Sequence, residues 1–204
     1  MTSDGPRFSG LATASPHEKL HAFFGIDIGL QQRVGAFVVL FSMIEQQLEF
    51  VLLTRSKPPS ADGILPTDRM TVSDRLSALR ALAPSEPSLA TDIELIADVG
   101  EALMTARHTI AHGAPLEHGR MERNRSWFGE QRKRPFAALQ MGEPVLDAAV
   151  TASEILFRLL GSIGASLSGQ HDVAAVMAPS AEDKNIASSA VGMIGQAMDN
   201  LRSD

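Results

Sequence analysis

Apolar residues recur at steps of three and four along four long segments of the chain, and this spacing constrains the fold more than any other sequence feature. The clearest segment runs from about residue 29 to 54, and similar patterns cover about 88–112, 144–167 and 181–202. The repeating positions of the first segment are Val34, Phe37, Val38, Phe41, Ile44, Leu48, Val51 and Leu52. A period near 3.6 residues gives each segment one broad apolar face as a helix. With almost no convincing strand, the sequence predicts an all-α, up-and-down helical bundle.

Two shorter helices are expected outside these segments. Ser15-Pro16-His17-Glu18 has the form of a helix start, with Ser15 as the N-cap and Glu18 as its capping-box partner. A second helix of about a dozen residues should follow the loop at 55–70, with Thr71 or Ser73 as its cap. These signals place helix starts at two points where the apolar pattern alone is short.

The chain divides into three parts by composition. Residues 1–14 are rich in Gly, Ser and Thr and are expected to form a flexible arm. Residues 15–168 form the predicted bundle domain, and residues 169–204 a linker followed by an amphipathic helix. Within the bundle, residues 113–142 change character, and Ser126–Gly129 with Phe136–Leu139 are candidates for a small β-hairpin after the third long helix.

Composition excludes several classes of function. The chain has no cysteine, which excludes disulfides, thiolate-ligated metals and a thiol nucleophile. No apolar run reaches the roughly 18 residues of a spanning helix, and no secretory signal is visible, so we expect a cytoplasmic protein that does not bind membranes. The net charge of −6 argues against a surface that is basic throughout.

Metal and cofactor patterns are weak. His17-Glu18-Lys19-Leu20-His21 matches the His-Glu-x-x-His pattern of zinc proteases, but Glu18 already has a simpler role in the capping box. His108 and His112 are also four residues apart, and no third ligand is evident. Glycine-rich phosphate loops are missing. We therefore expect no metal and no cofactor.

Two opposite charges lie where hydrophobic residues are expected. On a helical wheel Arg107 falls within the apolar stripe of the third long segment, and Glu45 falls at the centre of the apolar face of the first. Burying a charge costs free energy unless an opposite charge pairs with it, so we infer that Glu45 and Arg107 face each other or a shared cleft. His112 is expected at the end of the same helix as Arg107, where the helix dipole favours imidazolium. The alternative is a structural ion pair with a histidine serving as a C-terminal cap.

Arg107, four intervening residues and His112, at the end of a long amphipathic helix, resemble the Arg-x4–6-His signature of the HEPN superfamily. His108 matches the polar residue that usually follows the arginine, and the resemblance covers about residues 28–168. The resemblance implies a helical bundle that dimerises. It also implies a metal-independent endoribonuclease of the toxin–antitoxin or defence type, with RNA and an antitoxin or other protein as partners. Some members of the superfamily bind without cutting.

The same resemblance implies a role for each residue. A ribose 2′-OH would attack its adjacent phosphodiester and leave a 2′,3′-cyclic phosphate. His112 would act as general base or acid, and Arg107 would stabilise the negative charge of the transition state. His108 would orient the substrate or assist proton transfer, and Glu45 would hold Arg107 in its rotamer.

A basic segment follows the histidine. Its six cations, within 15 residues, are Arg120, Arg123, Arg125, Arg132, Lys133 and Arg134. The window carries +4 and the rest of the chain −10, and Trp127 and Phe128 lie between the two basic groups. Cations interleaved with aromatic rings suit single-stranded RNA, with charge for phosphates and ring faces for bases. The alternative is a solvated loop.

Two functions from different classes therefore remain at this stage. One is an RNA-directed, HEPN-like endoribonuclease. The other is a non-catalytic helical module for protein interaction or nucleic-acid binding. The position of the Arg107 motif discriminates between them, because a motif that faces away from any cleft or dimer seam favours the module.

Overall fold

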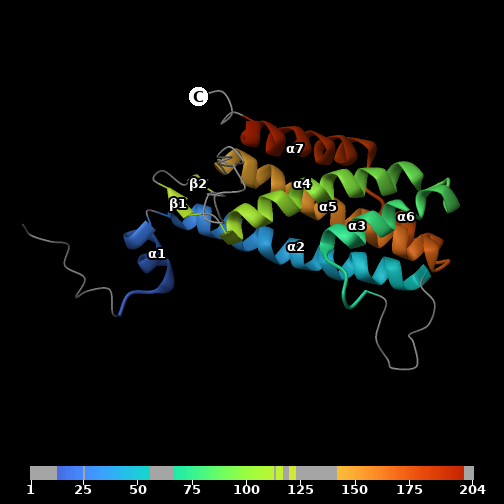
Figure 1. The fold of residues 1–204 in the computed structure, drawn as a ribbon, viewed down its shortest axis with the longest axis horizontal. Coiled ribbons are helices and arrows are strands. Elements are labelled where there is room, and N and C mark those ends of the chain that lie inside the picture. The colour runs from blue at the N-terminus through green and yellow to red at the C-terminus, as the bar shows by residue number, and fades with distance from the viewer. Residues whose placement is uncertain are drawn as a thin grey trace, which may run out of the picture.

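The computed structural model describes residues 13–24, 26–55, 67–112, 114–116, 120–122 and 142–199. Seven α-helices lie in these ranges: α1 (Pro16–Phe24), α2 (Ile28–Arg55), α3 (Val72–Arg80), α4 (Ala90–His112), α5 (Glu143–Leu167), α6 (His171–Met177) and α7 (Ala181–Asp199). Two short strands, β1 (Ala114–Leu116) and β2 (Arg120–Glu122), pair antiparallel directly after α4. The all-α bundle predicted from the sequence is confirmed (Figure 1).

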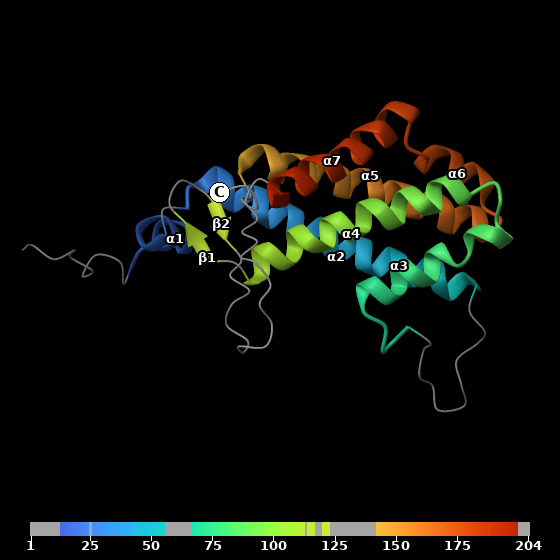
Figure 2. The same cartoon turned by 45° about the horizontal axis from the view of Figure 1, so that its top comes forward.

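The four long helices alternate in direction along the chain, and two pairs of neighbouring helices run parallel. At the start of α2, Arg33 Nε donates to Asp147 Oδ1 at the start of α5 over 2.7 Å, and Gly164 near the end of α5 packs beside Phe50. Likewise α4 and α7 lie side by side in one direction, joined by Lys184 Nζ and Asp92 Oδ1 at 2.6 Å (Figures 1 and 2). α2 with α5, and α4 with α7, are therefore the two parallel pairs of the bundle.

One apolar core joins the long helices. Its largest fully buried side chains are Phe37, Ile44, Leu48, Leu76, Leu79, Ile93, Ile96, Leu103, Leu146, Leu156 and Leu159. The helix after the expected linker takes part in this core too, because Ala187, Ala190 and Ile194 of α7 are buried in the same cluster. Among the described residues, α2, α3, α4, α5 and α7 therefore share a single packed interior.

Two of the long helices are unusually apolar along their whole length. By length and composition alone, α2 and α5 would each suffice to cross a membrane. In the most apolar stretch of α5, 56% of the residues are buried within the bundle, whereas in α2 the share is 33%. Much of the apolar surface of α2 consequently remains exposed in this single chain.

The expected helix starts and ends agree closely with those observed. α1 has the predicted capping box, in which the Ser15 N–H donates to Glu18 Oε2 at 2.7 Å and the Glu18 N–H donates to Ser15 Oγ at 3.3 Å. α1 also contacts α2, since His17 Nδ1 hydrogen-bonds Gln31 Oε1. α6 was expected to be part of a linker. The segments proposed for a β-hairpin, 126–129 and 136–139, lie outside the described residues.

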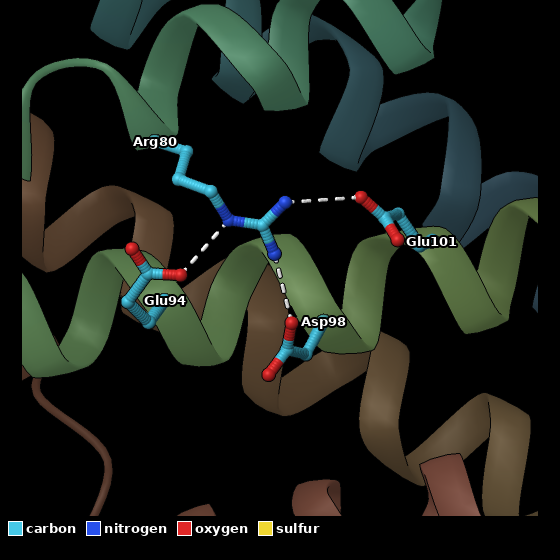
Figure 3. Close-up of polar contacts among 4 residues, drawn as sticks. All are labelled: Arg80, Glu94, Asp98 and Glu101. Carbon is cyan, nitrogen blue, oxygen red and sulfur yellow. Dashed lines mark hydrogen bonds and ion pairs between the residues drawn. The ribbon is translucent and has the colours of Figure 1, made fainter.

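The short helix α3 is fixed against α4 by one arginine. Arg80 donates to three carboxylates on one face of α4, with distances of 2.8 Å to Glu94, 2.8 Å to Asp98 and 3.2 Å to Glu101 (Figure 3). The hydrogen bond to Glu94 raises the pKa of Arg80 above its ordinary value. Gly100 permits the close approach, because a Cβ there would lie 2.7 Å from Leu76 Cδ2. These contacts hold the last two turns of α3 against the N-terminal half of α4.

Candidate functional site

A pocket of about 390 Å³ lies where α2, the first turn of α3 and the C-terminal half of α4 meet. Its lining residues are Phe41, Glu45, Thr71, Val72, Ser73, Met104, Arg107 and His108. The structure thus brings together three of the residues selected from the sequence: Glu45, Arg107 and His108.

Arg107 lies in this pocket because it occupies the same face of α4 as the buried Leu103. Leu103 is fully buried, and Arg107 follows it one helical turn later, half-buried at the edge of the core. On the adjacent inward face, Ala106 and Thr109 are buried, and the Thr109 hydroxyl donates to the Thr105 carbonyl at 3.0 Å. Because the inward face is filled by these small residues, Arg107 and His108 are placed at the boundary between core and solvent.

α2 delivers Glu45 in the same way. Phe41 is buried, and Glu45 follows it one turn later with a half-buried side chain. Within the described residues, no ion pair or hydrogen bond joins the Glu45 carboxylate to the Arg107 guanidinium. The two charges therefore share a pocket without neutralising each other by direct contact.

The first turn of α3 closes the third side of the pocket. Thr71 is the N-cap, and its hydroxyl accepts a hydrogen bond from the Asp74 N–H at 3.2 Å. The Asp74 carboxylate in turn accepts from the Thr71 N–H at 2.9 Å and from the Thr71 hydroxyl at 2.7 Å. The side-chain hydrogen bond from Thr71 holds the pKa of Asp74 below its ordinary value. A rigid turn with Thr71, Val72 and Ser73 on the pocket wall results.

A polar cluster that the sequence analysis did not identify supports this wall. Arg75 Nη2 lies 3.5 Å from Glu49 Oε2, and the Thr67 hydroxyl donates to Glu49 Oε1 at 2.7 Å. Arg75 Nη1 also donates to the backbone carbonyl of Glu45 at 3.3 Å, while Arg75 Nε is buried and has no hydrogen-bond partner among the described residues. Glu49 lies one helical turn after Glu45, and this spacing is the sequence signal that could have identified the cluster. The cluster fixes α3 to the stretch of α2 that carries Glu45.

The remaining predicted residues fall outside this description. His112 is the last residue of α4, and its side chain lies outside the described residues. Arg120 begins β2, of which only the backbone is described. The other members of the basic segment are also outside the described ranges: Arg123, Arg125, Trp127, Arg132, Lys133 and Arg134. Of the motif residues Arg107, His108 and His112, only the first two can therefore be placed in the pocket.

A second pocket of about 350 Å³ differs in its chemistry. It lies between α4 and α7, and its lining includes Asp98, Glu101, Thr105 and Ile194 but no cation. Both of its carboxylates contact Arg80. In the ranges given above, no group of three or more His, Asp or Glu residues is arranged to hold a metal ion. The pocket of Glu45 and Arg107 is thus the better candidate for binding an anionic ligand.

Comparison with known proteins provides no relative for this chain. No protein-family model, curated protein or solved structure matches it.

Proposed function

We propose that this chain is an RNA-directed protein of HEPN-like type and a metal-independent endoribonuclease. The observation that carries the proposal is the position of Arg107 and His108, which line an open pocket in the last turns of the helix that ends at His112. A purely structural motif has no need of a pocket. A cation at a pocket wall is suited to stabilise the charge of a phosphoryl transition state.

The proposed reaction uses no external cofactor. The ribose 2′-oxygen forms a bond to phosphorus as its proton passes to a base, and the bond from phosphorus to the 5′-oxygen breaks as that oxygen gains a proton. His112 is assigned the proton transfers and Arg107 the stabilisation of the extra negative charge. His108 is assigned to substrate orientation. The products are a 2′,3′-cyclic phosphate and a 5′-hydroxyl.

The basic segment between Arg120 and Arg134 extends the proposal to single-stranded RNA. Its charge of +4 in a chain of net charge −6 provides a local attraction for phosphates, and Trp127 provides a stacking surface. A cytoplasmic homodimer, regulated by an antitoxin or another protein partner, completes the proposal. The exposed apolar residues of α2, among them Val39 and Phe50, support the dimer.

The direct test is cleavage of RNA in EDTA. We expect wild-type protein to cut single-stranded RNA and leave cyclic-phosphate ends, and Arg107→Ala and His112→Ala to lose at least about 100-fold in rate. Arg158→Ala and His171→Ala are matched controls, because Arg158 pairs with carboxylates away from the pocket and His171 is exposed on α6. Both controls should cut like wild type.

Two outcomes contradict the enzyme proposal. One is absence of cleavage by wild-type protein, and the other is equal cleavage by all four variants. RNA binding without cleavage would instead assign the chain to the non-catalytic modules.

A further inference from the structure

Arg107 is the exception among the arginines of helices α2–α5. The other five each have a carboxylate within ion-pair distance: Arg33, Arg55, Arg75, Arg80 and Arg158. The acceptor best placed to pair with Arg107 is Glu45, in the same pocket, and among the described contacts the two do not meet. Half-buried opposite charges that do not pair lose hydration without direct compensation. Such an arrangement suits a ligand that carries a complementary group for each of them.

The pocket defines the chemistry of that ligand. The guanidinium of Arg107, with His108 beside it, suits a phosphate. The Glu45 carboxylate, as an ion, only accepts hydrogen bonds and therefore needs donors. Phe41, Val72 and Met104 provide an apolar part of the same lining. A nucleotide unit combines the three requirements, because it has an anionic phosphate, a flat apolar base face and donor groups at the base edge. The pocket's 390 Å³ lies within the range of small-molecule sites.

The donor requirement distinguishes the four bases. On the Watson–Crick edge, guanine places its ring N–H next to its amino group, so that two donors meet the two oxygens of a carboxylate. Adenine and cytosine place one amino group beside a ring nitrogen that is an acceptor, and uracil places its single N–H between two carbonyl oxygens. A carboxylate facing any of these three edges meets a lone pair, which repels it. Single-stranded RNA exposes this edge to proteins.

We propose that Glu45 is a specificity-determining residue that reads a guanine base in this pocket, while Arg107 binds an adjacent phosphate. The inference rests on the proposed function for RNA as the ligand class. It replaces the role that the sequence suggested for Glu45, which was to hold Arg107 in its rotamer. The two roles differ in what removal of the carboxylate does: a positioning residue affects every RNA alike, whereas a base-reading residue affects only RNA with guanine.

The test measures binding in a background that does not cut. Full-length His112→Ala protein is titrated into fluorescein-labelled hexanucleotides of uridine that carry one central guanosine, adenosine, cytidine or uridine, and anisotropy gives each Kd. We expect the guanosine oligonucleotide to bind about tenfold more tightly than the others. Adding Glu45→Gln should reduce that preference below about twofold, because it weakens binding of the guanosine oligonucleotide and does not weaken binding of the all-uridine one. Glu154→Gln, the same change on an exposed glutamate of α5, is the matched control and should keep the preference.

The possible results separate this inference from the function on which it rests. Equal binding of the four oligonucleotides overturns it, and so does a Glu45→Gln change that weakens all four equally, since that assigns Glu45 to positioning Arg107. Melting temperatures of all variants show that each is folded. If the guanosine preference depends on Glu45 but wild-type protein does not cut RNA, the ribonuclease proposal is wrong and the base-reading proposal stands. If wild-type protein cuts RNA but shows no guanosine preference, the ribonuclease proposal stands and the base-reading proposal is wrong.

Discussion

At the scale of single residues, the contrast between Arg107 and Arg75 separates a ligand-binding cation from a structural one. Arg75 is 85% buried against Glu49 and two backbone carbonyls, whereas Arg107 lines a pocket and has no carboxylate partner within the described residues. Helical spacing alone identifies both Arg107 and Glu45 as charges on apolar stripes. It does not show which of these charges form ion pairs, because the Arg75–Glu49 pair depends on where α3 packs.

This contrast predicts two different effects on stability. Arg75→Ala leaves Glu49 partly buried without its cation, so we expect a loss of about 1–3 kcal/mol in the free energy of unfolding. Arg107→Ala removes no ion pair, so we expect a loss below about 1 kcal/mol. Urea unfolding followed by circular dichroism measures both. A loss for Arg107→Ala as large as that for Arg75→Ala would restore the structural ion pair with Glu45.

At the scale of helices, side-chain caps determine where three of them begin. Ser15 with Glu18, Thr71 with Asp74 and Ser180 with Asp183 form the same reciprocal pattern at the starts of α1, α3 and α7. In each case the hydrogen bonds from the cap lower the pKa of the acid. The ionised acid is therefore favoured in the folded chain, and its contribution to stability is present above the unfolded pKa and lost as the pH falls through the folded one.

For α3 this gives a pH-dependent prediction. At pH 7 Asp74→Asn should lower the melting temperature, because asparagine replaces a charged acceptor of two hydrogen bonds from Thr71. The difference from wild type should shrink as the pH falls below the ordinary aspartate value of 3.8, since the wild-type acid is then protonated as well. Melting curves from pH 7 to 2.5 check it. Thr71→Ala alone should cost about 1 kcal/mol, and Asp74→Asn added to it should cost less than it does in wild type. A gap that stays constant with pH would contradict this account.

The helix bounds also show what sequence patterns do and do not contain. The bounds of the long helices were predictable because each carries many repeats of the apolar period; for example, 144–167 was expected and Glu143–Leu167 is observed. α6 has only seven residues, too few for a period, and follows Gly169, whose positive φ of 75° ends α5. β1 and β2, of three residues each, carry no alternation to detect. The lateral order of the helices, on which the pocket depends, is not encoded in any single helix.

At the scale of the whole molecule, the two parallel pairs leave one side of α2 uncovered. Val39, Met43 and Phe50 are exposed and lie within about 40° of each other on the helical wheel. A helix that is apolar on all sides is typical of one buried on all sides. The apolar spacing of α2 predicts a single core face, and Val39, Met43 and Phe50 lie outside the positions that define it. The exposed stripe supports the proposed homodimer, with α2 packing against its symmetry mate.

The last prediction tests that assembly. In a two-fold dimer a residue near the axis meets its own copy, so Val39→Glu places two carboxylates together in an apolar seam. We expect wild-type protein to be dimeric by size-exclusion chromatography with light scattering, and Val39→Glu to be monomeric. Val176→Glu on α6 is the matched control: Val176 is 84% exposed, more than the 61% of Val39, but lies apart from α2 and should leave the dimer intact. A dimer that survives Val39→Glu would place the interface elsewhere. A wild-type monomer that sediments with lipid vesicles, and loses that property with Val39→Glu, would show that the apolar face of α2 binds lipid and not a second copy.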